Sequence, residues 1–182
     1  MPKKSAPREP EPAAAAAHAP ALDPSGSRAS AEVSVRVLRR FRIVFNAVKA
    51  HFQQVEKQAG IGGAQVWALS LVAAAPGLRV GQLAGLMDIH PTTASNLVRV
   101  LLRAGLIETI RDVADRRTVR LNATPAGREV LRRAPGPFAG VLPDALARLD
   151  TPTLDRLDRD LGSLIDVLGA DPRAAGQPLA QM

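Results

Sequence analysis

The apolar positions along the chain predict a mainly helical protein. Between residues 31 and 59 they recur at spacings of three, four or seven, the period of one helix face. These positions are Val37, Phe41, Val44, Val48 and Val55, with Phe45 and Phe52 widening the stripe. A glycine-rich stretch at 60–63 ends this helix. Residues 64–75 are apolar on nearly every side and therefore predict a buried second helix, which Pro76 and Gly77 terminate.

Two short helices and a hairpin are expected next. Val80–Met87 and Pro91–Ala104 are helical in pattern, with a turn at 88–90 between them. Pro91 fits the first turn of its helix, where a missing N–H leaves no hydrogen bond unmade. The inward positions of the second helix are Ala94, Leu97, Val98, Leu101 and Leu102. After Gly105, two strands are predicted at Leu106–Arg111 and Thr118–Leu121.

Three more helices are predicted towards the C-terminus, over 125–133, 138–149 and 152–168. Thr124 and Pro125 form a capping residue and a first-turn proline for the first of them. The last helix carries leucines at alternating spacings of three and four, namely Leu154, Leu157, Leu161, Leu164 and Leu168. Residues 1–30 and 170–182 are poor in large apolar residues, so we expect both ends to be disordered.

Composition narrows the class of protein. A chain of 182 residues with 46% hydrophobic residues can form one compact domain with loose ends. The absence of cysteine excludes a disulfide scaffold, thiolate metal sites and a cysteine nucleophile. The longest apolar run is too short to span a bilayer, and prolines and acids replace the apolar stretch of a signal peptide. We therefore expect a soluble, cytoplasmic protein without a membrane partner.

The distribution of charge points to an anionic polymer. The net charge is +7, and residues 79–133 hold ten basic against five acidic side chains, whereas residues 144–171 hold three against seven. Two short helices followed by a hairpin with a basic tip predict a winged helix-turn-helix, with a wing of two or three strands. An α-helix fits the major groove of duplex DNA, and a narrow charged ribbon can enter the minor groove.

The helix at 91–104 is the candidate recognition helix. Its outward residues are Thr92, Thr93, Ser95, Asn96, Arg99 and Arg103, and no acidic residue lies between Asp88 and Glu108. Hydroxyl groups near a helix N-terminus can approach phosphates or base edges beside the helix N–H groups. Asn96 could pair with adenine, and Arg99 could pair with guanine or hold a phosphate. The alternative is that these residues form an ordinary solvated helix face.

From about Val33 to Leu168 the chain resembles MarR-type transcriptional regulators. The matching stretches are Gln82–Ala84, His90–Ile107, Asp112 with Asp115, Arg116 and Arg117, and Leu121 leading to Thr124–Gly127. The chain departs from the family pattern at two positions. His90 stands where a small hydroxyl residue often caps the helix, and Ala123 replaces a larger apolar residue.

The resemblance implies a homodimer that binds a palindromic operator and is released by a small anionic or phenolic ligand. It assigns Asp115 to pair with arginine in the wing loop, and Arg116 and Arg117 to minor-groove and phosphate contacts. Together with the composition of the two ends, it divides the chain into a disordered tail (1–30), a dimerisation helix (31–60), the winged helix-turn-helix (61–127), a C-terminal dimerisation region (128–169) and a second tail (170–182). The expected dimer contacts are Val37, Val44, Leu154, Leu157, Leu161, Leu164 and Leu168. A leucine stripe on a terminal helix independently requires a partner surface.

The resemblance also implies a ligand pocket between the dimerisation helices and the DNA-binding part. His51 lies on the apolar stripe of its helix and so faces inward. The pocket would suit a small aromatic acid of the hydroxybenzoate or hydroxynicotinate type. Its candidate residues are Arg40, Phe41, Phe45, His51, Trp67, Ser70 and His90. The alternatives are that His51 is bonded to backbone in the core and that the aromatic residues are plain core.

Other functions fit the residues less well. The serines lack the context of a catalytic nucleophile, so we expect no enzyme activity and no cofactor. The histidines form no local metal motif, although zinc binding by His51 and His90 with carboxylates is conceivable. The main alternative is an architectural protein that binds any duplex without a ligand. A protein-interaction module that has lost DNA binding is disfavoured by the arginines at 99, 116 and 117.

Overall fold

The computed structural model describes residues 24–111 and 119–179 and divides the chain into two compact units, residues 1–40 and 41–182. The described part of the first unit is the beginning of helix α1 (Pro24–Ala59). Every residue from 30 to 40 is exposed there, including Val33, Val35, Val37 and Leu38. The prediction of disorder over residues 1–30 differs from the structure at 24–30, which are helical. That stretch has no apolar periodicity, so the pattern could not locate the helix start.

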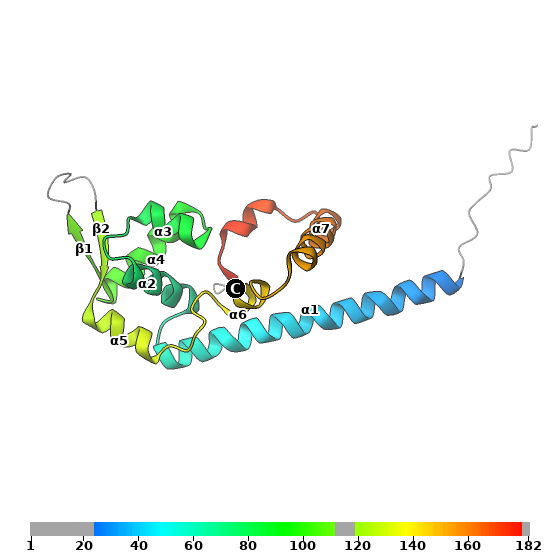
Figure 1. Ribbon diagram of the computed structural model, residues 1–182, viewed down its shortest axis with the longest axis horizontal. Helices are drawn as coiled ribbons and strands as arrows, with labels where there is room; N and C mark the ends of the chain where they lie inside the picture. Colours follow the sequence, from blue (N-terminus) through cyan, green and yellow to red (C-terminus); the bar gives the residue numbers. More distant parts are fainter. Residues whose placement is uncertain (1–23, 112–118, 180–182) are drawn as a thin grey trace, which may run out of the picture. The chain divides into compact units, whose positions relative to one another are not determined.

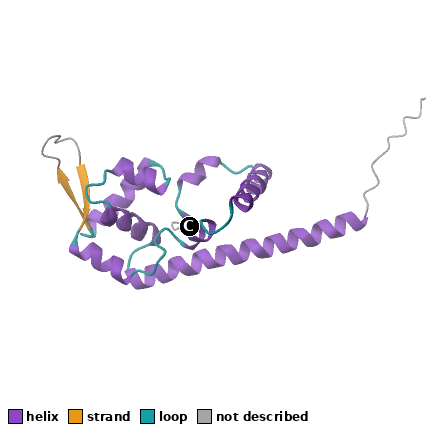
Figure 2. Cartoon of the chain, in the orientation of Figure 1, coloured by secondary structure: helices purple, strands orange, loops and turns teal. Residues whose placement is uncertain are grey.

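The second unit contains the remaining helices and the strands (Figures 1 and 2). After the end of α1, the described elements are α2 (Gly63–Ala74), α3 (Val80–Met87), α4 (Pro91–Arg103), β1 (Ile107–Arg111), β2 (Val119–Ala123), α5 (Pro125–Arg133), α6 (Val141–Leu146), α7 (Thr151–Leu168) and a 3₁₀ turn, η1 (Pro172–Gly176). The predicted fold class, mainly helical with a small β-wing, is confirmed. None of the described helices combines the length and the hydropathy needed to cross a lipid bilayer.

Helix α2 is the centre of the core. Its residues Val66, Ala68, Leu69 and Val72 are fully buried, and it contacts α3, α4, α5 and β2. Leu83, Leu101 and Leu121 bring the facing helices and the hairpin against it, each without exposed surface. Burying one such side chain stabilises the fold by about 1.5–3 kcal/mol relative to leaving it in water. The predicted all-round apolar character of this helix therefore reflects contacts on several sides.

The wing is an antiparallel hairpin with a short third segment. β1 and β2 pair in the register Ile107 with Ala123 through Arg111 with Val119. The loop after α2 adds an isolated bridge between Leu78 and Leu121, in which the Leu121 N–H donates to the Leu78 carbonyl at 2.9 Å. Gly77 N–H also donates to the Leu121 carbonyl and to the Asn122 side-chain oxygen, at 3.0 and 2.8 Å. The base of the wing is thus fixed to the segment that leads into α3.

The start of α5 is fixed against the end of α4. Thr124 caps α5, because its hydroxyl oxygen accepts from Gly127 N–H at 3.1 Å and donates to the Gly105 carbonyl at 2.8 Å. Gly127 lies against β1 so closely that a Cβ atom would come within 2.1 Å of the Leu106 carbonyl oxygen. Only glycine allows this approach. The sequence Thr124–Gly127 therefore sets where α5 meets the wing.

The C-terminal end differs from the sequence expectation of a disordered tail over 170–182. Residues 170–179 are described, and they include η1 and a buried Pro178. The scarcity of large apolar residues predicts disorder here, but Asp171 caps the turn by accepting from Arg173 N–H at 3.0 Å. Helix α7 has no buried residue, and Leu157, Leu161, Leu164 and Leu168 are 37–68% exposed.

Candidate nucleic-acid interface

Helices α3 and α4 pack against each other and present the outer face of α4 to solvent. The turn between them contains Asp88, which has a left-handed backbone with φ 51° and ends α3. His90 precedes α4, and its Nδ1 accepts from Thr92 N–H at 3.3 Å. The departure at His90 therefore still supplies a helix cap, through an imidazole nitrogen in place of a hydroxyl.

The six residues predicted on the outer face of α4 lie on its accessible side. Thr92, Asn96, Arg99 and Arg103 are exposed, and Thr93 and Ser95 are half-buried. The opposite face, with Ala94, Leu97, Val98 and Leu101, is buried in the core. The pattern therefore orients the helix as expected. The leucine at 102 is the difference, because it was expected to face inward and is 36% exposed.

Hydrogen bonds order this face before any partner is bound. Arg99 donates from a guanidinium nitrogen to the Asn96 side-chain oxygen at 3.0 Å. Ser95 donates its hydroxyl to the Pro91 carbonyl at 2.8 Å, and Arg103 donates to the Arg99 carbonyl at 3.4 Å. Asn96 and Arg99 therefore form a joined pair, whereas the sequence treats them as independent base readers. Asn96 can bind a base edge only if its hydrogen bond with Arg99 is shared or broken.

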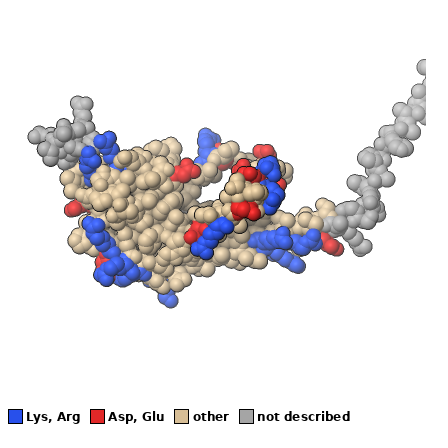
Figure 3. All heavy atoms as spheres, viewed as in Figure 1, with Lys and Arg blue, Asp and Glu red and all other residues tan. Residues whose placement is uncertain are grey.

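Further exposed basic residues lie at the start of α3 and on α5. Arg79 is exposed at the start of α3, and α5 carries exposed Arg128, Arg132 and Arg133, of which Arg132 pairs with Glu129. Figure 3 shows Lys and Arg atoms gathered over α5, and mixed acidic and basic atoms over α7. A surface of this kind attracts phosphates, while an acidic one would repel them. Asp115, Arg116 and Arg117, predicted for the wing, lie outside the described residues.

The predicted ligand residues are not gathered into one site. Phe45 is 58% exposed and stacks on the half-buried Phe41 with ring centroids 6.3 Å apart. His90 is exposed at the start of α4, and Ser70 donates to the Trp67 carbonyl at 2.7 Å within its own helix. Arg40 is exposed in the first unit. Helical spacing predicts which face a residue occupies, but not which distant segment covers that face.

His51 contacts a backbone carbonyl, which is the alternative to a ligand-binding role given in the sequence analysis. Its Nε2 lies 3.1 Å from the Pro137 carbonyl oxygen, and its ring packs edge-on against Phe52 with centroids 5.4 Å apart. This contact joins α1 to the turn before α6. Gly140 in that turn has φ 104°, a conformation that favours glycine, and a Cβ there would come within 3.0 Å of Phe52.

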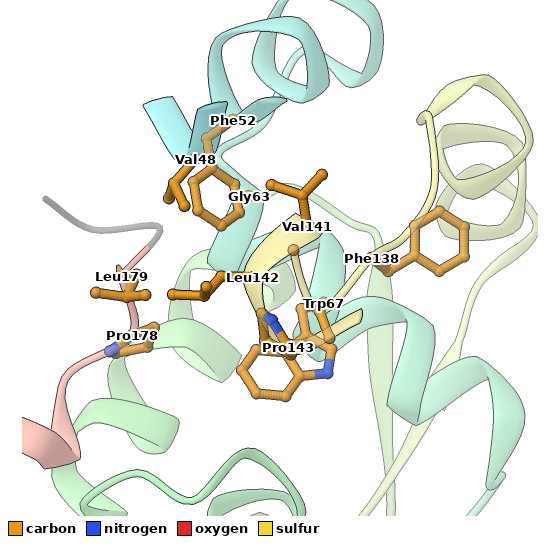
Figure 4. A pocket seen from close by; sticks show the side chains of 12 residues that line it. Val48, Phe52, Gly63, Trp67, Phe138, Val141, Leu142, Pro143, Pro178 and Leu179 are labelled. Carbon is orange, nitrogen blue, oxygen red and sulfur yellow. The ribbon is translucent and has the colours of Figure 1, made fainter. Parts of the chain in front are cut away.

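These contacts enclose a small apolar cavity of about 110 Å³ (Figure 4). Its walls come from α1, α2, the turn and start of α6, and the C-terminal residues 178 and 179. The lining residues are Val48, Phe52, Gly63, Trp67, Phe138, Ala139, Gly140, Val141, Leu142, Pro143, Pro178 and Leu179. Of the predicted ligand residues only Trp67 is among them. Sequence analysis missed the rest, because they come from four segments that no local pattern connects.

Comparison with known proteins shows similarity in part of the sequence and in the fold. Residues 59–118 match the model of the MarR family. A crystal structure described as a MepR-like protein complexed with pseudoligands is similar at a TM-score of 0.51 and 17% identity, covering 75% of this chain and 96% of that chain. The S. aureus MepR–DNA complex is similar at a TM-score of 0.50 and 21% identity, covering 70% and 93%. No curated protein matches this chain in sequence.

The family match spans α2, α3, α4 and β1, the elements that build the acid-free face of α4 and the first strand of the wing. The two solved structures share the fold over most of their own length. These findings show that residues 59–118 are similar to the MarR family and that the chain shares the winged-helix fold of these solved structures.

Proposed function

We propose that the chain is a homodimeric repressor that binds a palindromic operator and leaves it when a small aromatic acid binds. The observation that carries this proposal is the outer face of α4, where exposed Asn96, Arg99 and Arg103 stand on a buried scaffold without an acidic neighbour on the helix. A rigid polar helix face of this kind is the element that reads the major groove in helix-turn-helix proteins.

Dimerisation is supported by apolar surface on α7. Leu157, Leu161, Leu164 and Ile165 are 37–44% exposed on one 18-residue helix that has no buried residue. An apolar stripe of this length costs free energy in water and is relieved by a partner surface. A two-fold axis would present two copies of α4 to half-sites about one helical turn of DNA apart.

The effector part of the proposal rests on the apolar cavity. Phe52, Trp67 and Phe138 provide aromatic walls. The volume of about 110 Å³ is of the same order as the roughly 150 Å³ cavity that holds one benzene ring in another protein. A single aromatic ring is therefore the part of a ligand that this cavity suits, and a carboxylate would have to remain at its mouth.

The test is a fluorescence-anisotropy titration of labelled duplexes with the full chain. A duplex that the chain enriches from a random-sequence pool is compared with a scrambled duplex at fixed salt, with and without benzoate, 4-hydroxybenzoate or 6-hydroxynicotinate. Selective binding that one acid reverses would support the whole proposal. Selective binding without any response would retain the regulator and remove the aromatic-acid effector.

Equal binding to both duplexes would contradict the proposal and favour the architectural alternative. Such a protein would bind mainly through phosphates, and its affinity would fall steeply with salt on every sequence. The same titration repeated at several salt concentrations therefore separates the two functions.

A further inference from the structure

The C-terminal residues 171–179, here called the strap, connect the apolar cavity to the start of the recognition helix. The strap begins where Asp171 caps η1, and its carboxylate also pairs with Arg173 at 2.9 Å. These hydrogen bonds lower the pKa of Asp171, with the Arg173 side chain as the largest cause and the Arg173 N–H second. The strap therefore has local structure of its own.

An interior residue of the strap, Gly176, contacts the start of α4. The His90 N–H donates to the Gly176 carbonyl at 3.3 Å, and His90 is the residue whose imidazole caps α4. A Cβ atom at Gly176 would lie 3.8 Å from the His90 Cβ, so the two backbones run in close contact. His90 thus has its side chain bonded to the recognition helix and its backbone bonded to the strap.

The C-terminal end of the strap forms part of the cavity wall. Pro178 is buried and Leu179 is 41% exposed, and both line the cavity together with Val48 and Leu142 (Figure 4). An occupant too large for the 110 Å³ cavity either protrudes through its mouth or displaces part of this lining, because packed interiors have few spare voids. Residues 178 and 179 lie two and three positions after the bonded Gly176, so their displacement would act on the same short segment.

We propose that the strap couples the cavity to the recognition helix: docked, it holds α4 in the DNA-binding position, and displaced, it releases the start of α4 and weakens operator binding. This inference rests on the proposed function and adds the route by which a ligand would act. A ligand favours whichever state it binds better, so an occupant that needs the strap displaced shifts the population towards the weakly binding state.

The coupling can be tested without a ligand by expelling the strap. Pro178→Asp places a charge at the buried position, while Gln177→Asp places the same charge one residue earlier at an exposed position. We expect Pro178→Asp to raise the Kd for the enriched duplex by about tenfold and Gln177→Asp to leave it within about twofold. Hydrogen exchange of the His90 amide should accelerate in the first variant only. If Pro178→Asp does not fold, Leu179→Asp replaces it at a partly exposed position.

A disulfide can then restore the docked strap. The chain has no cysteine, and the 3.8 Å separation of the Cβ positions at residues 90 and 176 lies within the roughly 3.5–4.5 Å range of disulfides. The variant His90→Cys, Gly176→Cys, Pro178→Asp should bind the duplex weakly when reduced and regain most of the lost affinity when oxidised. Comparing two redox states of one variant cancels the loss of the His90 cap.

Each outcome of these experiments either supports or overturns the proposed coupling. Faster amide exchange without a change in affinity would overturn the coupling, and unchanged exchange would overturn the docked strap. If the wild-type chain shows no preference for any duplex, the proposed function fails instead, and the exchange result still reports on the strap.

Discussion

Single residues in this chain are constrained by what lies next to them. Gly127 is the clearest case, because a Cβ atom there would overlap the Leu106 carbonyl oxygen at 2.1 Å. The sequence marks Thr124 and Pro125 as the start of a helix, and the structure shows why the glycine follows. Neighbours that come from another element, such as Leu106, cannot be inferred from the local pattern.

Replacing Gly127 by alanine should therefore destabilise the fold. We expect the free energy of unfolding to fall by about 2–3 kcal/mol, since backbone atoms must move to admit the methyl group. Gly85→Ala is the matched control, because nothing lies within 4 Å of a Cβ at this position in α3. That control should gain about 0.5–1 kcal/mol from helix propensity. Chemical denaturation measures both, and equal effects would contradict the overlap.

Asp150 should make the free energy of unfolding depend on pH in the acidic range. It caps α7, and the Thr153 hydroxyl and then the Thr153 N–H lower its pKa below the usual 3.8. A lowered folded-state pKa adds stability above the unfolded-state value, and this is lost as pH falls through the folded-state pKa. Asp150→Asn keeps a capping oxygen but does not titrate, so its free energy of unfolding should depend less on pH below about 4. Parallel curves for both proteins would exclude this contribution.

At the scale of elements, the helix bounds could be predicted where residues that end or cap helices mark them. The helices at 63–74, 80–87, 91–103 and 125–133 lie within one residue of their predicted bounds, because glycine, proline and capping residues mark their ends. The strands were harder: the second runs over 119–123, where 118–121 was predicted, since a short alternating run has no strong stop signal. The cavity could not be predicted, because Phe52, Phe138 and Leu179 become neighbours only through tertiary contacts.

Helix α4 and the wing should contribute differently to DNA binding, α4 to sequence preference and the wing to affinity for any duplex. Arg99→Ala should relax the preference at one operator position and cost about 1–3 kcal/mol there, because a bidentate base contact is lost. The variant Arg116→Ala, Arg117→Ala should weaken binding to all duplexes and reduce the salt slope by about two. Anisotropy titrations on single-base operator variants separate these effects.

Arg148→Ala provides the control for the loss of charge, because Arg148 pairs with Asp144 at 2.7 Å in the acidic C-terminal part. It should bind as the wild type does. If the Arg99 and Arg148 variants behaved alike, the assignment of α4 to the groove would fail.

At the scale of the molecule, helix α7 carries apolar side chains that the rest of this chain leaves exposed to water. Leu161→Glu on α7 should produce monomers, since it places a charge within the exposed leucine stripe. Ser163→Glu adds the same charge on the same exposed helix outside the stripe and should leave the assembly unchanged. Sedimentation velocity gives the assembly state. A dimeric Leu161→Glu protein would show that the stripe has another use.

One wall of the cavity also has an optical consequence. Trp67 is the only tryptophan of the chain, and there is no tyrosine. It is half-buried and lines the cavity with Phe52 and Phe138. The intrinsic emission of this protein therefore comes from the cavity wall itself. A small molecule that enters would change the colour or the yield of that emission, so the unlabelled, unmodified chain reports its own occupancy.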